Sequence, residues 1–119
     1  KAEKISKVLL CSGKLYYELL ERKEKDQLNN VAIVRLEQLY PLPTDQLLEL
    51  KKKYKNAEWT WVQEEPENMG ALTYLLRVLS PQLPLRFVAR PESASPATGS
   101  HKAHDREQKQ LIDAAFETK

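Results

Sequence analysis

The stretch KVLLCSGKLYYELL, residues 7–20, joins an apolar run to a helical pattern through a single glycine. The run at 7–12 is almost continuously apolar, which is typical of a parallel strand covered on both faces. After Gly13, apolar residues recur at the spacing of one helix face: Leu15, Tyr16, Leu19 and Leu20. The stretch therefore predicts a strand followed at once by a helix that packs on it.

Three more strand candidates repeat this unit along the chain. They are VAIVRL at 31–36, EWTWVQ at 58–63 and LRFVAR at 85–90, and each precedes a helical pattern. The clearest helical stripe comprises Leu72, Leu75, Leu76 and Leu79. This alternation predicts a three-layer α/β/α fold with a mostly parallel sheet of four strands, and residues 1–119 are few enough to form a single domain.

Composition narrows the class of protein. The 19 Lys and Arg nearly balance the 17 Asp and Glu, for a net charge of +2, so we expect neither nucleic acid nor a membrane as partner. No run approaches a membrane span, and no signal-peptide core is present. The single cysteine, Cys11, is expected in the core and fits a reducing compartment, the bacterial cytoplasm or an organelle matrix. Because the chain begins with Lys1, we expect a fragment or a processed product.

The strand-to-helix junctions are expected to share one edge of the sheet. All three glycines, Gly13, Gly70 and Gly99, follow a predicted strand and lie at or before a helix start. In a parallel sheet these junctions lie at the carboxyl edge, where ligands and partners usually bind. The adjacent Glu64 and Glu65 end one strand there, but neighbouring strand residues point in opposite directions, so shared proton chemistry is not expected.

The last junction contains SASPATGSHKAH, residues 93–104, which is rich in hydroxyl groups and histidine. A Ser/His/Asp hydrolase would need a nucleophile elbow, and the segment has none. His101 and His104 form only one metal-ligand pair, without a third ligand at a recognisable spacing. An anion could bind hydroxyl and N–H groups at the helix start, although no phosphate-loop pattern is present. A stiff connector with a helix cap remains the structural alternative.

Four stretches together resemble a known family. VLLCSGKLYYEL, VAIVRLEQLYPLP, WVQEEPENMGA and SASPATGSHKAHDREQ occur in the order and at the separations typical of the C-terminal domain of the 2-oxoglutarate dehydrogenase E1 component. The resemblance covers about residues 7–116. It implies an intact enzyme that uses thiamine diphosphate and Mg²⁺, bound outside this domain, to decarboxylate 2-oxoglutarate and succinylate the lipoyl group of its E2 component. The fragment itself is expected to hold no catalytic, cofactor-binding or metal-binding residue.

The resemblance also implies a fold and partners. The fold would be that of transketolase C-terminal domains, with the strand order 2-1-3-4 and a further, antiparallel strand from upstream bordering residues 31–36. An isolated chain would then have an open strand edge and is expected to self-associate. The implied partners are the enzyme's own N-terminal and middle domains, a second copy in a homodimer, and the dihydrolipoyl succinyltransferase E2.

The candidate interface or effector surface is the carboxyl edge. Gln38 matches a region that reaches an acetyl-CoA activator in some relatives, but the arginines expected just beyond it are replaced by Thr44, Asp45 and Gln46. Two alternatives stay open: a free-standing module that senses nucleotides or CoA, and an E1 paralogue for a related 2-oxo acid. The candidate residues are Ser12, Gly13, Lys14, Gln38, Glu64, Glu65, Asn68, Gly70, Ser95, Gly99, Lys102 and His104.

Overall fold

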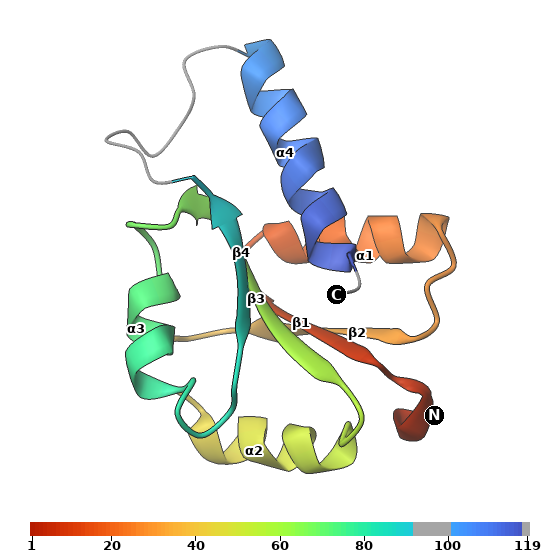
Figure 1. Ribbon diagram of the computed structural model, residues 1–119, viewed down its shortest axis with the longest axis vertical. Coiled ribbons are helices and arrows are strands. Elements are labelled where there is room, and N and C mark those ends of the chain that lie inside the picture. Colours follow the sequence, from red (N-terminus) through yellow and green to blue (C-terminus); the bar gives the residue numbers. More distant parts are fainter. Residues whose placement is uncertain (92–100, 118–119) are drawn as a thin grey trace.

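Strands and helices alternate along the chain in the computed structural model, which describes residues 1–91 and 101–117 (Figure 1). A short 3-10 helix, η1 (Ala2–Lys4), comes first. The strands and helices that follow are β1 (Lys7–Ser12), α1 (Leu15–Lys25), β2 (Val31–Leu36), α2 (Thr44–Lys53), β3 (Glu58–Pro66), α3 (Leu72–Val78), β4 (Arg86–Arg90) and α4 (His101–Phe116).

The four strands form one parallel sheet in the order β2-β1-β3-β4, which confirms the predicted order. Lys7 of β1 is in register with Val31 on one side and with Glu58 on the other. β3 continues past the predicted end at residue 63. Its register with β4 shifts after Val62, and pairing resumes between Pro66 and Arg90. β3 therefore carries Glu64 and Glu65 within the strand.

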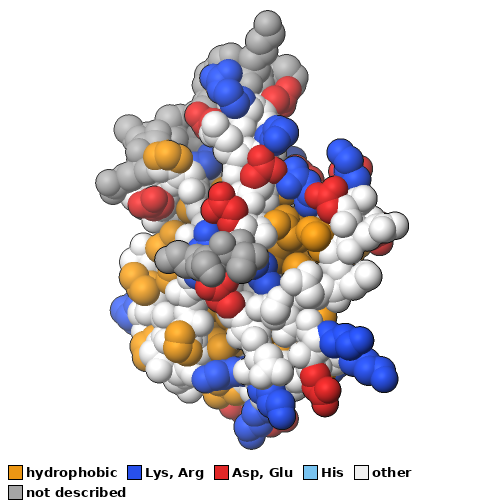
Figure 2. Space-filling model, turned by 45° about the vertical axis from the view of Figure 1, so that its right-hand side comes forward, with side chains coloured by type: hydrophobic (Ala, Val, Ile, Leu, Met, Phe, Trp, Pro, Cys, Tyr) orange, Lys and Arg blue, Asp and Glu red, His pale blue; other side chains and the backbone are white. Residues whose placement is uncertain are grey.

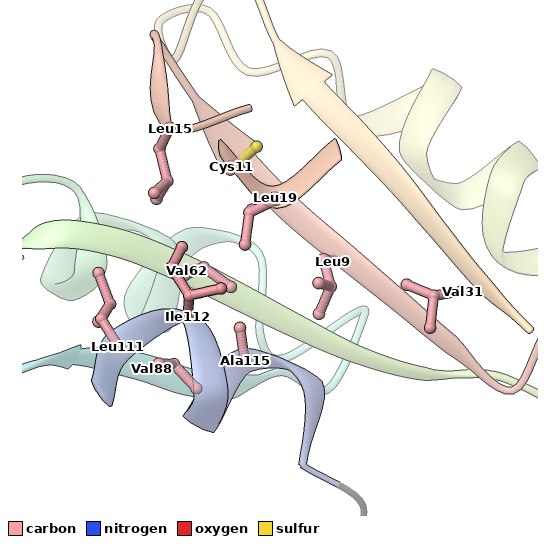
Figure 3. Close-up of a cluster of buried hydrophobic side chains, with 10 residues drawn as sticks. All are labelled: Leu9, Cys11, Leu15, Leu19, Val31, Val62, Val88, Leu111, Ile112 and Ala115. Atoms are coloured by element: carbon pink, nitrogen blue, oxygen red, sulfur yellow. The ribbon is translucent and has the colours of Figure 1, made fainter. Parts of the chain in front are cut away.

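Helices cover both faces of the sheet, as predicted for a three-layer fold (Figure 1). On one face, α1 and α4 pack over β1, β3 and β4, and Figure 3 shows the side chains that meet there. This core consists of Leu9, Cys11, Leu15, Leu19, Val31, Val62, Val88, Leu111, Ile112 and Ala115. On the other face, α2 and α3 cover a core of Val8, Leu10, Leu36, Leu47, Trp59, Trp61, Leu75, Leu79 and Leu83.

The alternation of strand side chains explains this division. Successive residues of a strand point to opposite faces, so Leu9 and Cys11 enter one core while Val8 and Leu10 enter the other. Trp59 and Trp61 share a face under the helices, as predicted. The predicted stripe on α3 is wrong at one position: Leu76 is 52% exposed. The helix is only seven residues long and turns this side chain away from the sheet.

Candidate functional site

Arg90, the last residue of β4, is a buried charge at the carboxyl edge, with only 6% of its surface exposed. Its guanidinium contacts three side chains of α4. Nη2 donates a hydrogen bond to Oε1 of Gln108 across 2.5 Å. Nη1 lies 3.4 Å from Nδ1 of His104 and 3.5 Å from Oε1 of Glu107. A buried charge requires such partners, because it has lost its hydration.

Gln108 extends these contacts to two other elements. Its side-chain carbonyl accepts the hydrogen bond from Arg90, and its amide nitrogen donates to Oε1 of Glu18 at 3.0 Å and to Oε1 of Glu64 at 3.1 Å. One amide thus connects α1, β3, β4 and α4. We call the six residues of this cluster the Arg90 network: Glu18, Glu64, Arg90, His104, Glu107 and Gln108.

The sequence of α4 explains why these side chains meet. Positions 104, 107 and 108 lie on one face of a helix, since residues three and four apart are neighbours there. The apolar residues Leu111, Ile112 and Ala115 continue the same face and are buried against the sheet. Because the apolar residues hold α4 against the sheet, the polar positions on the same face come to lie beside the end of β4. Arg90 then pairs with α4 where the apolar core ends.

The electrostatics of the cluster favour mutual pairing. One carboxylate, that of Glu107, contacts the guanidinium, and Gln108 offers its two N–H groups to the carboxylates of Glu18 and Glu64. Nε of Arg90 is buried without a partner among the residues that the structure describes. The arrangement holds α4 against the sheet edge, and its hydrogen-bonding groups are largely directed at one another.

A second cluster of hydrogen bonds closes the junction after β3. Oε1 of the buried Gln63 accepts a bond from the indole Nε1 of Trp61 at 2.8 Å. Its amide nitrogen donates to the backbone carbonyls of Glu65, Pro66 and Met69 at 3.2, 3.0 and 2.8 Å. One side chain therefore fixes the path of this loop.

Gly70 fits closely against this second cluster. Its φ is +70°, and a Cβ placed there would lie 3.1 Å from the side-chain oxygens of Gln63 and Glu65. Glycine is needed for both reasons, the conformation and the close approach. Asn68 lies exposed in the preceding turn.

The other predicted residues take separate positions along the edge. Ser12 ends β1, and the exposed Gly13 has a φ of +68° with nothing near its missing Cβ. Lys14 stands exposed before α1. In the β2–α2 loop, Nε2 of Gln38 donates to the carbonyl of Pro41 at 3.2 Å. None of these contacts joins the Arg90 network.

Of the predicted surface, the structure brings Glu64 and His104 into one network, through Gln108 and Arg90. Glu64 is half-buried and Glu65 exposed, and the side-chain oxygen of Glu65 lies beside Gly70. The two carboxylates thus serve different clusters, as expected from their opposite directions. Lys102 lies in the first turn of α4, but its side chain falls outside what the structure describes, as do Ser95 and Gly99.

The candidate list missed four members of the network: Glu18, Arg90, Glu107 and Gln108. One signal was present in the sequence. Arg90 ends an apolar strand, which places a charged residue at the edge of the buried sheet. The predicted last helix has polar residues at positions 104, 107 and 108, on the same face as its apolar residues. Nothing in the sequence pairs Glu18 with Gln108, 90 residues away.

Other kinds of site were sought in the described ranges, 1–91 and 101–117. Within them, no three His, Cys, Asp or Glu side chains are grouped in a way that could hold a metal ion. No helix in the same ranges is long and apolar enough to cross a membrane. Figure 2 shows acidic and basic side chains intermixed along α4, and basic side chains prominent at the end of the molecule where α2 lies.

Comparison with known proteins gives a consistent result. The sequence profile of the family described as "2-oxoglutarate dehydrogenase C-terminal" matches residues 1–116. The chain is 42% identical over 120 aligned residues to a 2-oxoglutarate dehydrogenase E1 component of Cupriavidus necator, covering 97% of this chain and 13% of the relative. It is 49% identical over 121 residues to the 2-oxoglutarate dehydrogenase E1/E2 component of Corynebacterium glutamicum, covering 98% of this chain and 10% of the relative.

A third relative, the 2-oxoglutarate dehydrogenase E1 component of Rickettsia felis, is 45% identical over 120 residues, covering 94% of this chain and 12% of the relative. The chain thus spans only about a tenth to an eighth of the length of these relatives. The resemblance seen in the four sequence stretches is confirmed, and the chain belongs to the 2-oxoglutarate dehydrogenase C-terminal family.

Proposed function

We propose that this chain is the non-catalytic C-terminal domain of a 2-oxoglutarate dehydrogenase E1 component and that it serves the assembly of that enzyme. The family match over residues 1–116 and the names of the relatives support this proposal. Within the domain, the Arg90 network fixes the position of α4 against the end of β4.

The observation that carries the assembly role is the mutual pairing in the Arg90 network. A catalytic acid or base must reach the reacting atoms of a substrate. Here the guanidinium of Arg90 is 6% exposed and contacts three side chains of α4, while the amide of Gln108 is engaged by three partners. These groups stabilise the arrangement of helices and strands.

The chemistry of the whole enzyme would take place outside this domain. The intact E1 would decarboxylate 2-oxoglutarate and transfer the succinyl group to a lipoyl group of the dihydrolipoyl succinyltransferase E2. By the family match, thiamine diphosphate and Mg²⁺ would be held by the N-terminal and middle domains of the intact enzyme. The carboxyl edge of this domain would face those domains or a second copy, in the bacterial cytoplasm or the mitochondrial matrix.

The test places His104→Ala in a protein that carries this chain behind the catalytic domains. Gln110→Ala is the matched control, because residue 110 lies exposed on the same helix. We expect His104→Ala to weaken association several-fold in sedimentation velocity, while decarboxylation per assembled molecule changes less than about twofold, because a residue outside the reacting site leaves the transition state unchanged. Gln110→Ala should alter neither. Normal assembly with abolished decarboxylation would show that His104 takes part in the chemistry.

One binding assay and one kinetic assay separate the proposal from its alternatives. Calorimetric titration of the 119-residue chain with AMP and with CoA esters should release no saturable heat. A saturable heat with either ligand would support a sensing module. For the larger protein, decarboxylation rates with 2-oxoglutarate should exceed those with 2-oxo diacids that are one carbon shorter or longer. The opposite preference would indicate a paralogue.

A further inference from the structure

The contact between His104 and Arg90 joins a permanent cation to a side chain that changes its charge. Nδ1 of His104 lies 3.4 Å from Nη1 of Arg90. The same Nη1 donates to Oε1 of Glu107 at 3.5 Å, and Nη2 donates to Gln108. Histidine ordinarily gains a positive charge between about pH 8 and pH 5. The guanidinium is 6% exposed, but the imidazole is only half-buried, so protons from the solvent reach the ring.

Hydrogen-bond chemistry determines the state of the ring in this contact. A guanidinium has donors and no acceptor, and it keeps its proton in proteins. Nδ1 of His104 must therefore accept the bond, which requires a neutral ring with its hydrogen on Nε2. The two hydrogens of Nη1 then meet two acceptors, Nδ1 of His104 and Oε1 of Glu107. A proton on Nδ1 would instead bring two donors and two like charges face to face.

The other charges around the ring favour its departure from Arg90 once it is protonated. Arg90 repels a protonated imidazole, whereas the carboxylates of the neighbouring elements attract it. Both effects draw the ring away from Nη1 and toward a carboxylate oxygen. The charged groups on the elements around His104 are Arg90 of β4, Glu64 of β3, Glu18 of α1, and Asp105 and Glu107 of α4.

The contact lies in the half of α4 that polar side chains attach to the sheet. The second half of the helix is held by buried apolar residues between Leu111 and Ala115. The start of α4 projects past the carboxyl edge of the sheet (Figure 1). Of the three side chains that reach Arg90, that of His104 is nearest to the start of the helix. Loss of this contact would therefore loosen the first turns of α4 and leave the apolar core in place.

We propose that His104 is a pH-dependent switch: its neutral ring binds Arg90 and holds the start of α4 against β4, and protonation of the ring releases that start. Arg90 keeps its bonds to Glu107 and Gln108 in the released state, so the sheet and both cores stay folded. The switch belongs to the domain itself and does not depend on the proposed assembly role, because the release takes place within one chain.

Nitrogen NMR of the imidazole in the 119-residue chain tests the contact itself. The substitution His101→Gln leaves His104 as the only histidine. At about pH 8 we expect the Nε2–H tautomer and nuclear Overhauser effects between the ring and the Arg90 side chain. Those effects should disappear as the ring is protonated in acid. A predominant Nδ1–H tautomer, effects that persist on the protonated ring, or a ring still neutral at about pH 5 would overturn the proposal.

Hydrogen exchange tests the release of the helix. Protection factors of the amides of residues 105–108, corrected for the intrinsic effect of pH, should fall at least about threefold between about pH 7.5 and pH 5, while those of residues 112–115 should change little. His104→Asn is the matched control, because its Oδ1 replaces Nδ1 as acceptor and does not titrate. This variant should be equally protected at both pH values. An equal fall in the variant would assign the response to the carboxylates, and that result or unchanged protection in the parent protein would contradict the proposal.

Discussion

Arg90 and Gln108 are joined by a 2.5 Å hydrogen bond from Nη2 to Oε1, which links the last residue of β4 to the middle of α4. This bond orients the Gln108 amide so that its N–H groups face Glu18 and Glu64. The position of one guanidinium thus determines how four elements meet at the carboxyl edge.

Replacing Arg90 with methionine should destabilise the fold by about 2–3 kcal/mol, because it leaves Glu107 and the Gln108 carbonyl without their buried donor. The estimate is kept at the low end of values for buried ion pairs, since the Glu107 side chain is 35% exposed. Urea unfolding measures the change. Arg77→Met is the control, because Arg77 lies exposed on α3 against Tyr74, and it should cost less than about 1 kcal/mol. Equal losses in the two variants would refute a special role for Arg90.

Two glycines with nearly the same φ allow a matched comparison. Gly13→Ala, at a φ of +68° with open space around it, should cost about 1–2 kcal/mol from backbone strain alone. Gly70→Ala, at +70°, should cost at least about 1 kcal/mol more, because its new methyl group would press on Gln63 and strain the bonds which that side chain makes. Thermal or urea unfolding of the two variants decides the matter. The prediction fails if they lose equal stability.

The thiol of Cys11 should be unreactive in the folded protein. Its side chain is 0% exposed, and burial raises its pKa to about 12, an effect that the nearby Arg35 only partly offsets. Since the thiolate is the reactive form, we expect no reaction with Ellman's reagent at pH 8 under native conditions. One thiol per chain should react promptly in about 6 M guanidinium, because the denaturant unfolds the chain and exposes Cys11. Rapid reaction of the native protein would show that the first strand is accessible.

The strands and layers were predictable because a strand that is buried on both faces is a nearly continuous apolar run in the sequence. The runs at 7–12 and 31–36 match β1 and β2 in full, since both strands are apolar nearly throughout. β3 was predicted too short because its apolar run stops at residue 63 and polar residues follow. Pairing resumes at Pro66 only after a register shift, which no local pattern encodes. Leu76 fits a helical stripe by spacing, yet its side chain is 52% exposed while the adjacent Leu75 is buried.

The candidate site was predictable only in its location. Glycine positions indicated the carboxyl edge, and both described glycines there do adopt a positive φ. The Arg90 network itself depends on partners 44 and 90 residues apart in sequence, which come together only after the sheet order and the tilt of α4 are set. Arg90 was overlooked because a charged residue at a strand end is ordinarily exposed, whereas here α4 covers it.

Asp113 of α4 should make stability depend on pH in the acid range. Its hydrogen bond from Arg22, at 2.8 Å, and a second one from Lys109, at 3.1 Å, hold the pKa of this carboxyl below its ordinary value. A lowered pKa in the folded state means that the carboxylate stabilises the fold above its unfolded pKa of about 3.9, and that this contribution is lost as the pH falls through the folded value. The side chain is 43% exposed, so solvent screening limits the contribution to less than about 1 kcal/mol.

Asp113→Asn should therefore lower the urea midpoint at pH 6.5, and the difference from the parent protein should shrink as the pH approaches about 3. Adding 1 M NaCl at pH 6.5 should reduce the difference too, because salt screens partly exposed charges. Glu24→Gln, at an exposed position of α1, is the control and should show neither trend. A difference that stays constant from pH 6.5 to pH 3 would mean that the substitution acts through packing or hydrogen-bond geometry, and that the charge of Asp113 does not connect α4 to α1.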